Sequence, residues 1–266
     1  MGVWALGLVS MFMDTSSELV HSLLPVFMVS VLGASVATVG VIEGVAEATA
    51  AFAKVFSGAV SDYFGKRKFF VVLGYGLAAF TKPIFPLAGS IGWVFTARFF
   101  DRIGKGIRGA PRDALVADIT PPDQRGAAYG LRQSLDSVGA FAGPLLAMVF
   151  MAWFANDIKA VLWVAVVPAF IAVALLIALV REPHQVNPRA GPRLPISRVD
   201  ARRLPRRYWL IVLLGAVFTL ARFSEAFLVL RALDVGFSLR YVPAVMVAMN
   251  VVYAAAAYPA GALADR

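Results

Sequence analysis

Long apolar stretches recur along most of this 266-residue chain, and they constrain its fold more than any other feature. Eight of them are long enough to cross a hydrocarbon core of about 30 Å as a helix. They lie at 3–32, 36–61, 69–89, 91–118, 125–151, 158–180, 208–231 and 241–264. With 60% hydrophobic and 15% charged residues, the chain is far more apolar than an ordinary soluble domain. The sequence therefore predicts an all-α integral membrane protein.

The net charge of +9 comes from basic residues that gather in a few connections between these stretches. Lys66, Arg67 and Lys68 follow the second stretch, Arg125 follows the fourth, and arginines are concentrated in 181–207. Because Lys and Arg collect in cytoplasmic loops, we expect the N-terminus and 181–207 to be cytoplasmic, in a bacterial inner (plasma) membrane. This topology signal accounts for the positive charge, so we expect the lipid bilayer and not nucleic acid as a partner.

Residues 181–207 are rich in proline and arginine and have no sustained apolar period, which is typical of a linker. The sequence thus predicts a six-helix transmembrane bundle at 1–180, a basic cytoplasmic linker at 181–207, and a shorter helical part at 208–266.

The shorter part resembles the start of the longer one. GAVSDY at 58–63 matches GALADR at 261–266, and the pair Ser17–Glu18 recurs as Ser224–Glu225. Two parallel halves joined by a linker are one repeat plan of secondary transporters. By this symmetry we expect 208–266 to be the first two helices of an incomplete second bundle, and the chain to be truncated after helix eight.

Ionisable side chains lie within three of the apolar stretches, spaced so that a helical period places each set on one face. The sets are Asp14, Glu18 and His21; Glu43, Glu47 and Lys54; and Arg98, Asp101, Arg102, Lys105 and Arg108. Each such charge costs about 2.5–3.5 kcal/mol at mid-membrane unless it is paired or hydrated. We therefore expect them to face inward, where carboxylates and guanidinium groups neutralise each other around a central polar cavity.

A carboxylate in such an interior can take up a proton and release it as the cavity faces first one side of the membrane and then the other. Direct contact with a cationic substrate, attraction of an anionic one by the arginines, and permanent ion pairs that only assemble the bundle are alternatives. The candidate residues for proton coupling or substrate binding are Asp14, Glu18, His21, Glu43, Glu47, Arg98, Asp101 and Arg102.

The cluster of Asp14, Glu18 and His21 also raises the hypothesis of a transported divalent metal ion. The chain has no cysteine, and its only other histidine, His184, lies in the predicted linker. We expect no resident metal and no cofactor. Lys82, near the outer end of the third stretch, is expected to extend its ammonium group to the membrane interface.

The segment GAVSDYFGKRK at 58–68 resembles the loop signature between helices two and three of the major facilitator superfamily. The matching positions are Gly58, Asp62, Gly65, Lys66, Arg67 and Lys68, while Tyr63 stands where the family usually has Arg or Lys. Asp62 ends a helix, where the dipole disfavours an anion, so it needs a partner. The basic cluster is one candidate; the resemblance implies another, the N-terminal end of a helix in the other half, in a gate that stabilises one conformation.

Two further motifs support this resemblance. In the fifth stretch, Gly130, Gly139, Gly143 and Pro144 keep the spacing of a motif associated with proton-coupled antiporters in that superfamily, with Ala147 where the last Gly is usual. In ARFFDRIGKG, Arg98 resembles the arginine of the fourth-helix motif, although Asp101 and Arg102 replace the usual Gln-Gly. From the residues alone, Gly139 and Gly143 lie on one face and permit close helix packing, and Pro144 bends the helix.

The resemblance implies a major facilitator superfamily fold, close to the bacterial drug/proton antiporters. It also implies a monomeric secondary active transporter that moves a small molecule or ion by alternating access, with proton-coupled export. Alternatives are proton-coupled uptake, metal or siderophore transport, or a truncated membrane protein that binds without transporting. An enzyme is not expected, because the chain has no cysteine nucleophile, no histidine pair, and no phosphate-binding loop joined to a strand.

Overall fold

The computed structural model describes residues 2–182, 204–221 and 223–264. Every regular element in these ranges is helical, which confirms the all-α prediction. The N-terminal part contains α1 (Gly2–Val26), η1 (Phe27–Val31), α2 (Val36–Phe64), α3 (Arg67–Thr81), α4 (Ile84–Leu87), α5 (Ile91–Asp118), η2 (Pro122–Gln124), α6 (Arg125–Trp153), α7 (Ile158–Val164) and α8 (Val166–Leu179).

Local sequence signals set several helix ends. Ser35 precedes α2, and its side chain accepts a hydrogen bond from the Thr38 backbone N–H at 3.1 Å. Gly65 ends α2 in the left-handed conformation, with φ of 62°, which glycine adopts without steric cost. Pro83 and Pro168 lack a backbone N–H, and they lie where two predicted spans divide into α3 with α4 and α7 with α8.

The C-terminal part contains α10 (Arg206–Ala221), α11 (Glu225–Asp234), η3 (Leu239–Tyr241) and α12 (Ala244–Ala264). The prediction of one continuous helix over 208–231 is therefore wrong. Ser224 is extended, with ψ of 139°, and its side chain accepts from the Ala226 N–H at 3.3 Å, so it begins a new helix.

The repeated pairs Ser17–Glu18 and Ser224–Glu225 differ in local structure, although both glutamates border the same space between the helices. The first pair lies inside α1, whereas the second forms the start of α11. Of the predicted linker, only 181–182 and 204–207 are described. The side chains of the predicted repeat at 261–266 also lie outside the described part of the chain.

Five helical segments among the described residues are long and apolar enough to cross a membrane: Val36–Phe64, Arg67–Leu87, Pro122–Trp153, Ile158–Leu179 and Leu239–Ala256. Predicted spans one and four are found as long helices, α1 and α5, although they are not among these five. Predicted span seven is divided into α10 and α11. Apolar side chains such as Phe52, Phe80 and Trp153 are exposed on the outside of the bundle, as a lipid-facing surface requires.

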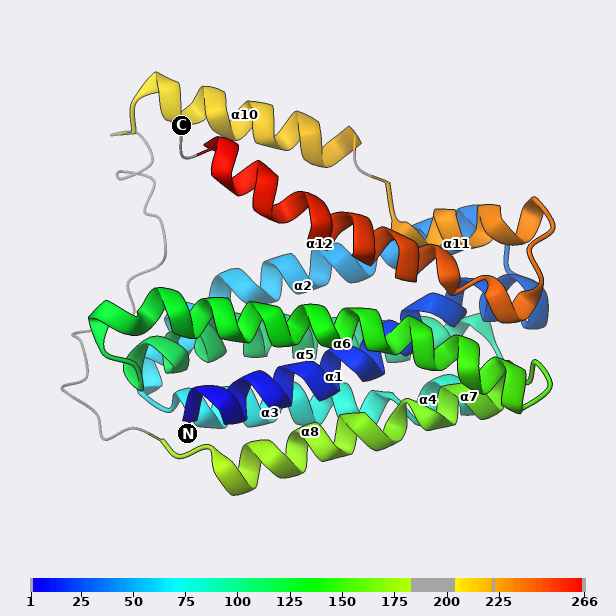
Figure 1. Ribbon diagram of the computed structural model, residues 1–266, viewed down its shortest axis with the longest axis horizontal. Coiled ribbons are helices and arrows are strands. Elements are labelled where there is room, and N and C mark those ends of the chain that lie inside the picture. The colour runs from blue at the N-terminus through cyan, green and yellow to red at the C-terminus, as the bar shows by residue number, and fades with distance from the viewer. Residues whose placement is uncertain (1, 183–203, 222, 265–266) are drawn as a thin grey trace.

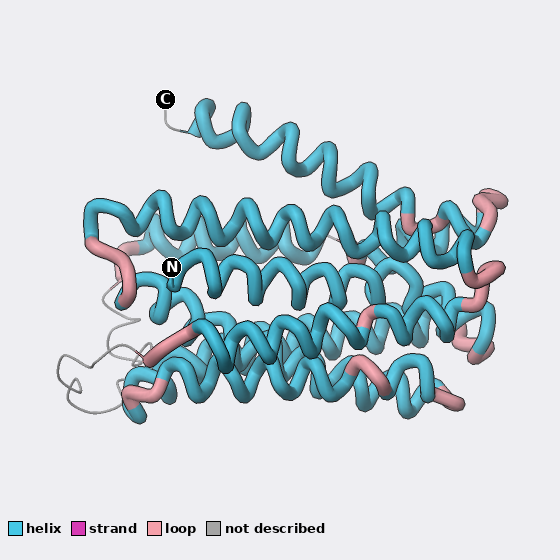
Figure 2. Tube along the Cα trace, turned by 60° about the horizontal axis from the view of Figure 1, so that its bottom comes forward, coloured by secondary structure: helices cyan, strands magenta, loops and turns pink. Residues whose placement is uncertain are grey.

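The long helices run side by side along one axis, as Figures 1 and 2 show. α1 packs mainly on α6 and α8, and α5 packs between α2 and α3. Figure 1 also places the start of α1, the α2–α3 turn and the α5–α6 connection at one end of the bundle, and α11 at the other. α11 contacts α1 and α2, and α12 contacts α6. A polar space remains between these elements.

Candidate functional site

Two adjoining cavities lie between the N-terminal helices and α10 to α12. The first has a volume of about 630 Å³ and the second about 450 Å³, within the usual range for small-molecule sites. Glu18, Glu47 and Lys105 line both. The first is also lined by His21, Glu43, Arg98, Arg102, Thr219, Phe223, Glu225, Phe227 and Met246. The second is also lined by Asp14, Lys54, Arg108, Arg112, Gln133, Asp136, Asn250 and Tyr253.

Two arginines of α5 neutralise two glutamates of α2. Arg98 Nη2 lies 2.5 Å from Glu43 Oε2, and Arg98 Nε donates to Glu43 Oε1 at 3.1 Å. Both side chains are buried. Arg102 Nη2 lies 2.9 Å from Glu47 Oε1, and the Glu47 side chain is more exposed than that of Glu43. Opposite charges predicted on separate spans are thus brought together at the first cavity.

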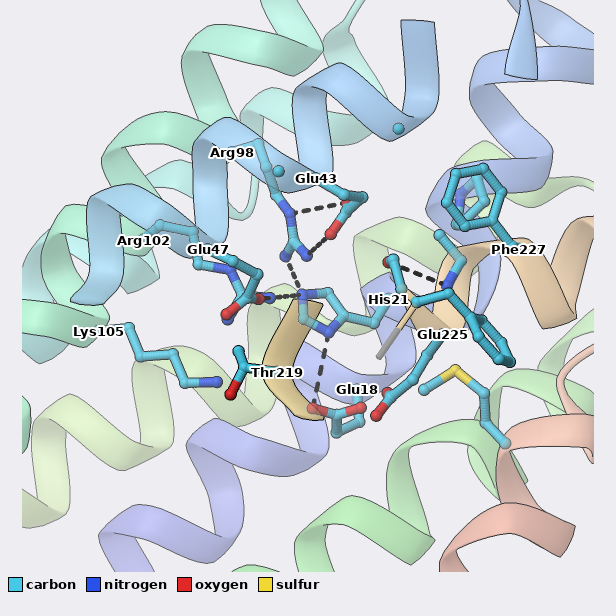
Figure 3. Close-up of a pocket in the computed structure, with 17 residues that line it drawn as sticks. Glu18, His21, Glu43, Glu47, Arg98, Arg102, Lys105, Thr219, Glu225 and Phe227 are labelled. Atoms are coloured by element: carbon cyan, nitrogen blue, oxygen red, sulfur yellow. Dashed lines mark hydrogen bonds and ion pairs between the residues drawn. The ribbon is translucent and has the colours of Figure 1, made fainter. Parts of the chain in front are cut away.

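His21 lies between these arginines and Glu18 (Figure 3). Arg98 Nη1 and Arg102 Nη2 both contact His21 Nε2, the second at 2.8 Å. Because a guanidinium group only donates hydrogen bonds, Nε2 must accept them, and the ring proton belongs on Nδ1. Nδ1 lies 3.6 Å from Glu18 Oε1. The imidazole therefore presents a lone pair to the arginines and an N–H to the Glu18 carboxylate.

Asp101 was predicted to line the cavity, but it is not one of the described residues that line either cavity. It is buried and accepts a hydrogen bond from Lys82 Nζ at 2.9 Å. Lys82 Nζ also donates to Ser17 Oγ at 3.0 Å. The prediction that Lys82 reaches the membrane interface is wrong: its side chain is 1% exposed. α3 ends just before Lys82, and the bend into α4 places it against α1 and α5.

This buried pair gives a testable stability effect. Replacing Lys82 by methionine should destabilise the protein by about 1–3 kcal/mol, because the Asp101 carboxylate loses its closest donor. Arg98 Nη1, 4.0 Å from Asp101 Oδ2, still offsets part of the charge. Adding Asp101→Asn should restore stability, as measured by equilibrium unfolding in mixed detergent micelles. A double variant less stable than Lys82→Met alone would contradict this explanation.

The glycines of α6 allow it to approach α1 beside the cavity carboxylates. A Cβ on Gly143 would lie 2.7 Å from the Thr15 carbonyl oxygen and 2.8 Å from Glu18 Cβ. A Cβ on Gly139 would meet the Met11 carbonyl oxygen. Pro144 is buried in the same helix, whereas Gly130 has open space around it. Three of the four predicted packing residues therefore lie at or near the α1 contact.

The predicted gate residues tie the α2–α3 turn to α5 and α8. Asp62 Oδ1 accepts from Arg67 Nη2 at 2.9 Å, so the neighbouring basic cluster supplies its partner among the described residues. Arg67 also pairs with Asp118 at the end of α5. The Lys68 backbone N–H donates to Glu182 at 2.9 Å, just beyond α8. Lys66 precedes α3 as its N-cap residue.

Another polar cluster, which the sequence did not predict, lies toward the start of α1. Arg112 Nη1 donates to Ser10 Oγ at 2.8 Å, and the Ser10 hydroxyl hydrogen-bonds the Tyr75 hydroxyl at 2.9 Å. Arg132 Nη1 donates to Asp136 Oδ2 at 2.7 Å. The spacing of four residues could have revealed the Arg132–Asp136 pair. The contacts of Arg112 join three helices, and no local spacing reveals them.

The comparisons with known proteins agree with this architecture. The family model of the major facilitator superfamily matches residues 6–266. An uncharacterised MFS-type transporter of Methanocaldococcus jannaschii is 32% identical over 99% of this chain and 66% of its own length. The multidrug resistance protein MdtH of Photorhabdus laumondii is 27% identical over 65% of this chain and 42% of its own length. The chain thus spans about two thirds of the first relative's length and less than half of the second's.

A solved structure has the same fold. A bacterial homologue of the human lysosomal transporter Spinster, in an inward-facing and unoccupied conformation, superposes with a TM-score of 0.77 at 18% identity. The match covers 99% of this chain and 62% of that one. With its apolar helices, charged interior and matching family model, this chain is an integral membrane protein that belongs to the major facilitator superfamily.

Proposed function

We propose that this protein is part of a secondary active transporter that moves a small solute by alternating access, with export coupled to proton entry. The charged cavity between 1–180 and the C-terminal helices is the observation that carries this proposal. Ion pairs between α2 and α5 and the Glu18–His21 contact of α1 lie together there at bilayer depth, where charged groups are costly and mark solute or proton pathways. Export is favoured by the likeness to multidrug resistance proteins.

Glu18 is the proton carrier in this proposal. Glu43 and Glu47 are each held by an arginine, so a proton would have to compete with a guanidinium group at either position. The contact of Glu18 is with the Nδ1 of a neutral imidazole at 3.6 Å. Since Glu18 lines both cavities, a proton and a solute can reach it by the same route.

The end of the bundle that carries the basic turns faces the cytoplasm in this proposal. The contacts of Arg67 with Asp62 and Asp118 hold α2, α3 and α5 together at that end. These three helices would move as one unit when the two halves rock about the cavity. Because Asp62 pairs with Arg67, the proposal needs no residue from the other half as a partner for Asp62.

Transport assays test the proposal. Cells that express the protein are screened against toxic compounds, and a protecting compound is then used in proteoliposomes with an imposed pH gradient. We expect flux to follow the gradient in the unsubstituted protein and to become independent of it in Glu18→Gln. Asp234→Asn, at an exposed site on α11, is the matched control and should behave as the unsubstituted protein.

A flux that ignores both the gradient and Glu18→Gln would remove proton coupling from the proposal. Binding of the compound without any movement across the membrane would overturn transport itself.

A further inference from the structure

Several charges around the two cavities are paired with one another, but five in the described part of the chain are not. Glu43, Glu47 and Asp136 each lie within 3 Å of an arginine nitrogen. By contrast, the side chains of Asp14, Lys54, Lys105 and Arg108 form no ion pair or hydrogen bond with any residue in the described part of the chain; the Arg108 guanidinium group lies over the Tyr75 ring, 4.6 Å from its centroid. The fifth, Glu18, makes its one such contact among the described residues with the neutral His21 ring, whose Nδ1 lies 3.6 Å from Oε1.

These five charges divide by sign between two walls. The carboxylates Asp14 and Glu18 belong to α1, one turn apart, on the wall that α1 forms with α6. The ammonium groups of Lys54 and Lys105 and the guanidinium group of Arg108 belong to the wall that α2 forms with α5. Figure 3 shows the Lys105 and Glu18 side chains extending from their helices toward the same space.

A space with a negative wall and a positive wall selects its contents by charge. A solute with only one charge could pair with one wall and would leave the other wall's charges desolvated and unpaired, which is costly at bilayer depth. A solute with one charge of each sign could pair with both. Arg98 and Arg102 do not change this balance of charge, because they are already paired with Glu43 and Glu47, although Arg102 Nε is buried without a hydrogen-bond partner among the described residues.

We propose that the cavity binds a small dipolar solute that carries both an amine and a carboxylate. Its ammonium group contacts Glu18 and Asp14, and its carboxylate contacts Lys105 and Lys54. Both cavities are large enough for a molecule of this kind. This solute would be the substrate class of the proposed transporter. The inference rests on that proposed function in one respect, namely that this cavity is the path of the solute.

Equilibrium binding tests this without a gradient. The protein in lipid nanodiscs is titrated with γ-aminobutyrate, phenylalanine and dialanine, and with the N-acetyl and methyl ester form of each, while its thermal unfolding is followed. N-acetylation removes the positive charge and esterification removes the negative one. At least one parent compound should stabilise the protein at concentrations about tenfold lower than either of its derivatives, which corresponds to about 1.4 kcal/mol.

Two variants should alter this selectivity in opposite directions. Lys105→Met should make the methyl ester bind as well as its parent, and Glu18→Gln should do the same for the N-acetyl form. Lys54→Met is a second variant on the positive wall if Lys105→Met does not fold. Asp234→Asn should leave the selectivity unchanged. The inference is overturned if, in the unsubstituted protein, every parent is matched by one of its derivatives, or if none of the nine compounds stabilises the protein.

The outcome is separable from that of the transport assays. Selective binding of a dipolar compound without flux would leave the inference in place and remove the transporter proposal. Gradient-driven flux of a singly charged compound, without dipolar selectivity in binding, would do the reverse.

Discussion

Replacing Arg98 by methionine should destabilise the protein by about 3–5 kcal/mol, because it leaves a buried carboxylate without its countercharge. Arg98 makes two contacts with Glu43, and the side chains of the pair are 3% and 8% exposed. Methionine fills a similar length and removes only the charge and the donors. Equilibrium unfolding in detergent micelles with increasing denaturing detergent measures the loss.

A double-mutant cycle separates the pair from other effects of the substitution. Glu43→Met alone should also be strongly destabilising, since it leaves Arg98 buried, while the double variant should recover much of the stability. Arg231→Met is the matched control: Arg231 pairs with Asp234 on α11, where both side chains are mostly exposed, and such pairs contribute about 1 kcal/mol or less. Strictly additive losses in the double variant would show that Arg98 and Glu43 are not energetically coupled.

The helical period predicted the charged faces of the helices that wall the cavity. Three or four residues separate Glu18 from His21 and Glu43 from Glu47, so one face of a helix must hold each pair. The cost of charges at bilayer depth then requires these faces to point inward. That argument needs only the sequence and the low polarity of the membrane interior. Because inward-facing charges require partners, it also predicted that carboxylates of α2 and guanidinium groups of α5 would meet.

The partner of each charge could not be predicted in the same way. Which atoms meet across two helices depends on their relative height and rotation, and no spacing within one helix gives these. The double contact of His21 with Arg98 and Arg102, and the absence of a partner for Asp14 among the described residues, both follow from this relative placement.

Helix breaks caused the other differences. Lys82 was expected at the membrane interface because its stretch was treated as one straight helix. The break before Pro83 turns it inward to Asp101 instead. Likewise, serine often caps helices, but the apolar residues on both sides of Ser224 favoured the prediction of one continuous span. A capping residue and a buried polar residue have the same signature in sequence, and tertiary contacts decide between them.

Replacing Gly143 by valine should cost about 1–3 kcal/mol or more, because α6 can no longer approach α1 as closely. An added Cβ would lie 2.7 Å from both the Thr15 carbonyl oxygen and the Leu19 backbone nitrogen. These are backbone atoms within one helix, so they cannot move aside separately as a flexible side chain could. The two helices must separate, and the thermal unfolding temperature in detergent should fall.

The same motif provides the control. Gly130 has no heavy atom within 4 Å of an added Cβ, so Gly130→Val should change stability much less than Gly143→Val, although both replace glycine by a β-branched residue in α6. Equal losses in the two variants would indicate that helix propensity, not the α1 contact, explains the effect. Because Glu18 Cβ lies 2.8 Å from the added atom, Gly143→Val should also weaken binding of dipolar probes in nanodiscs. The close approach of α6 would then be a condition for placing the Glu18 carboxylate in the cavity.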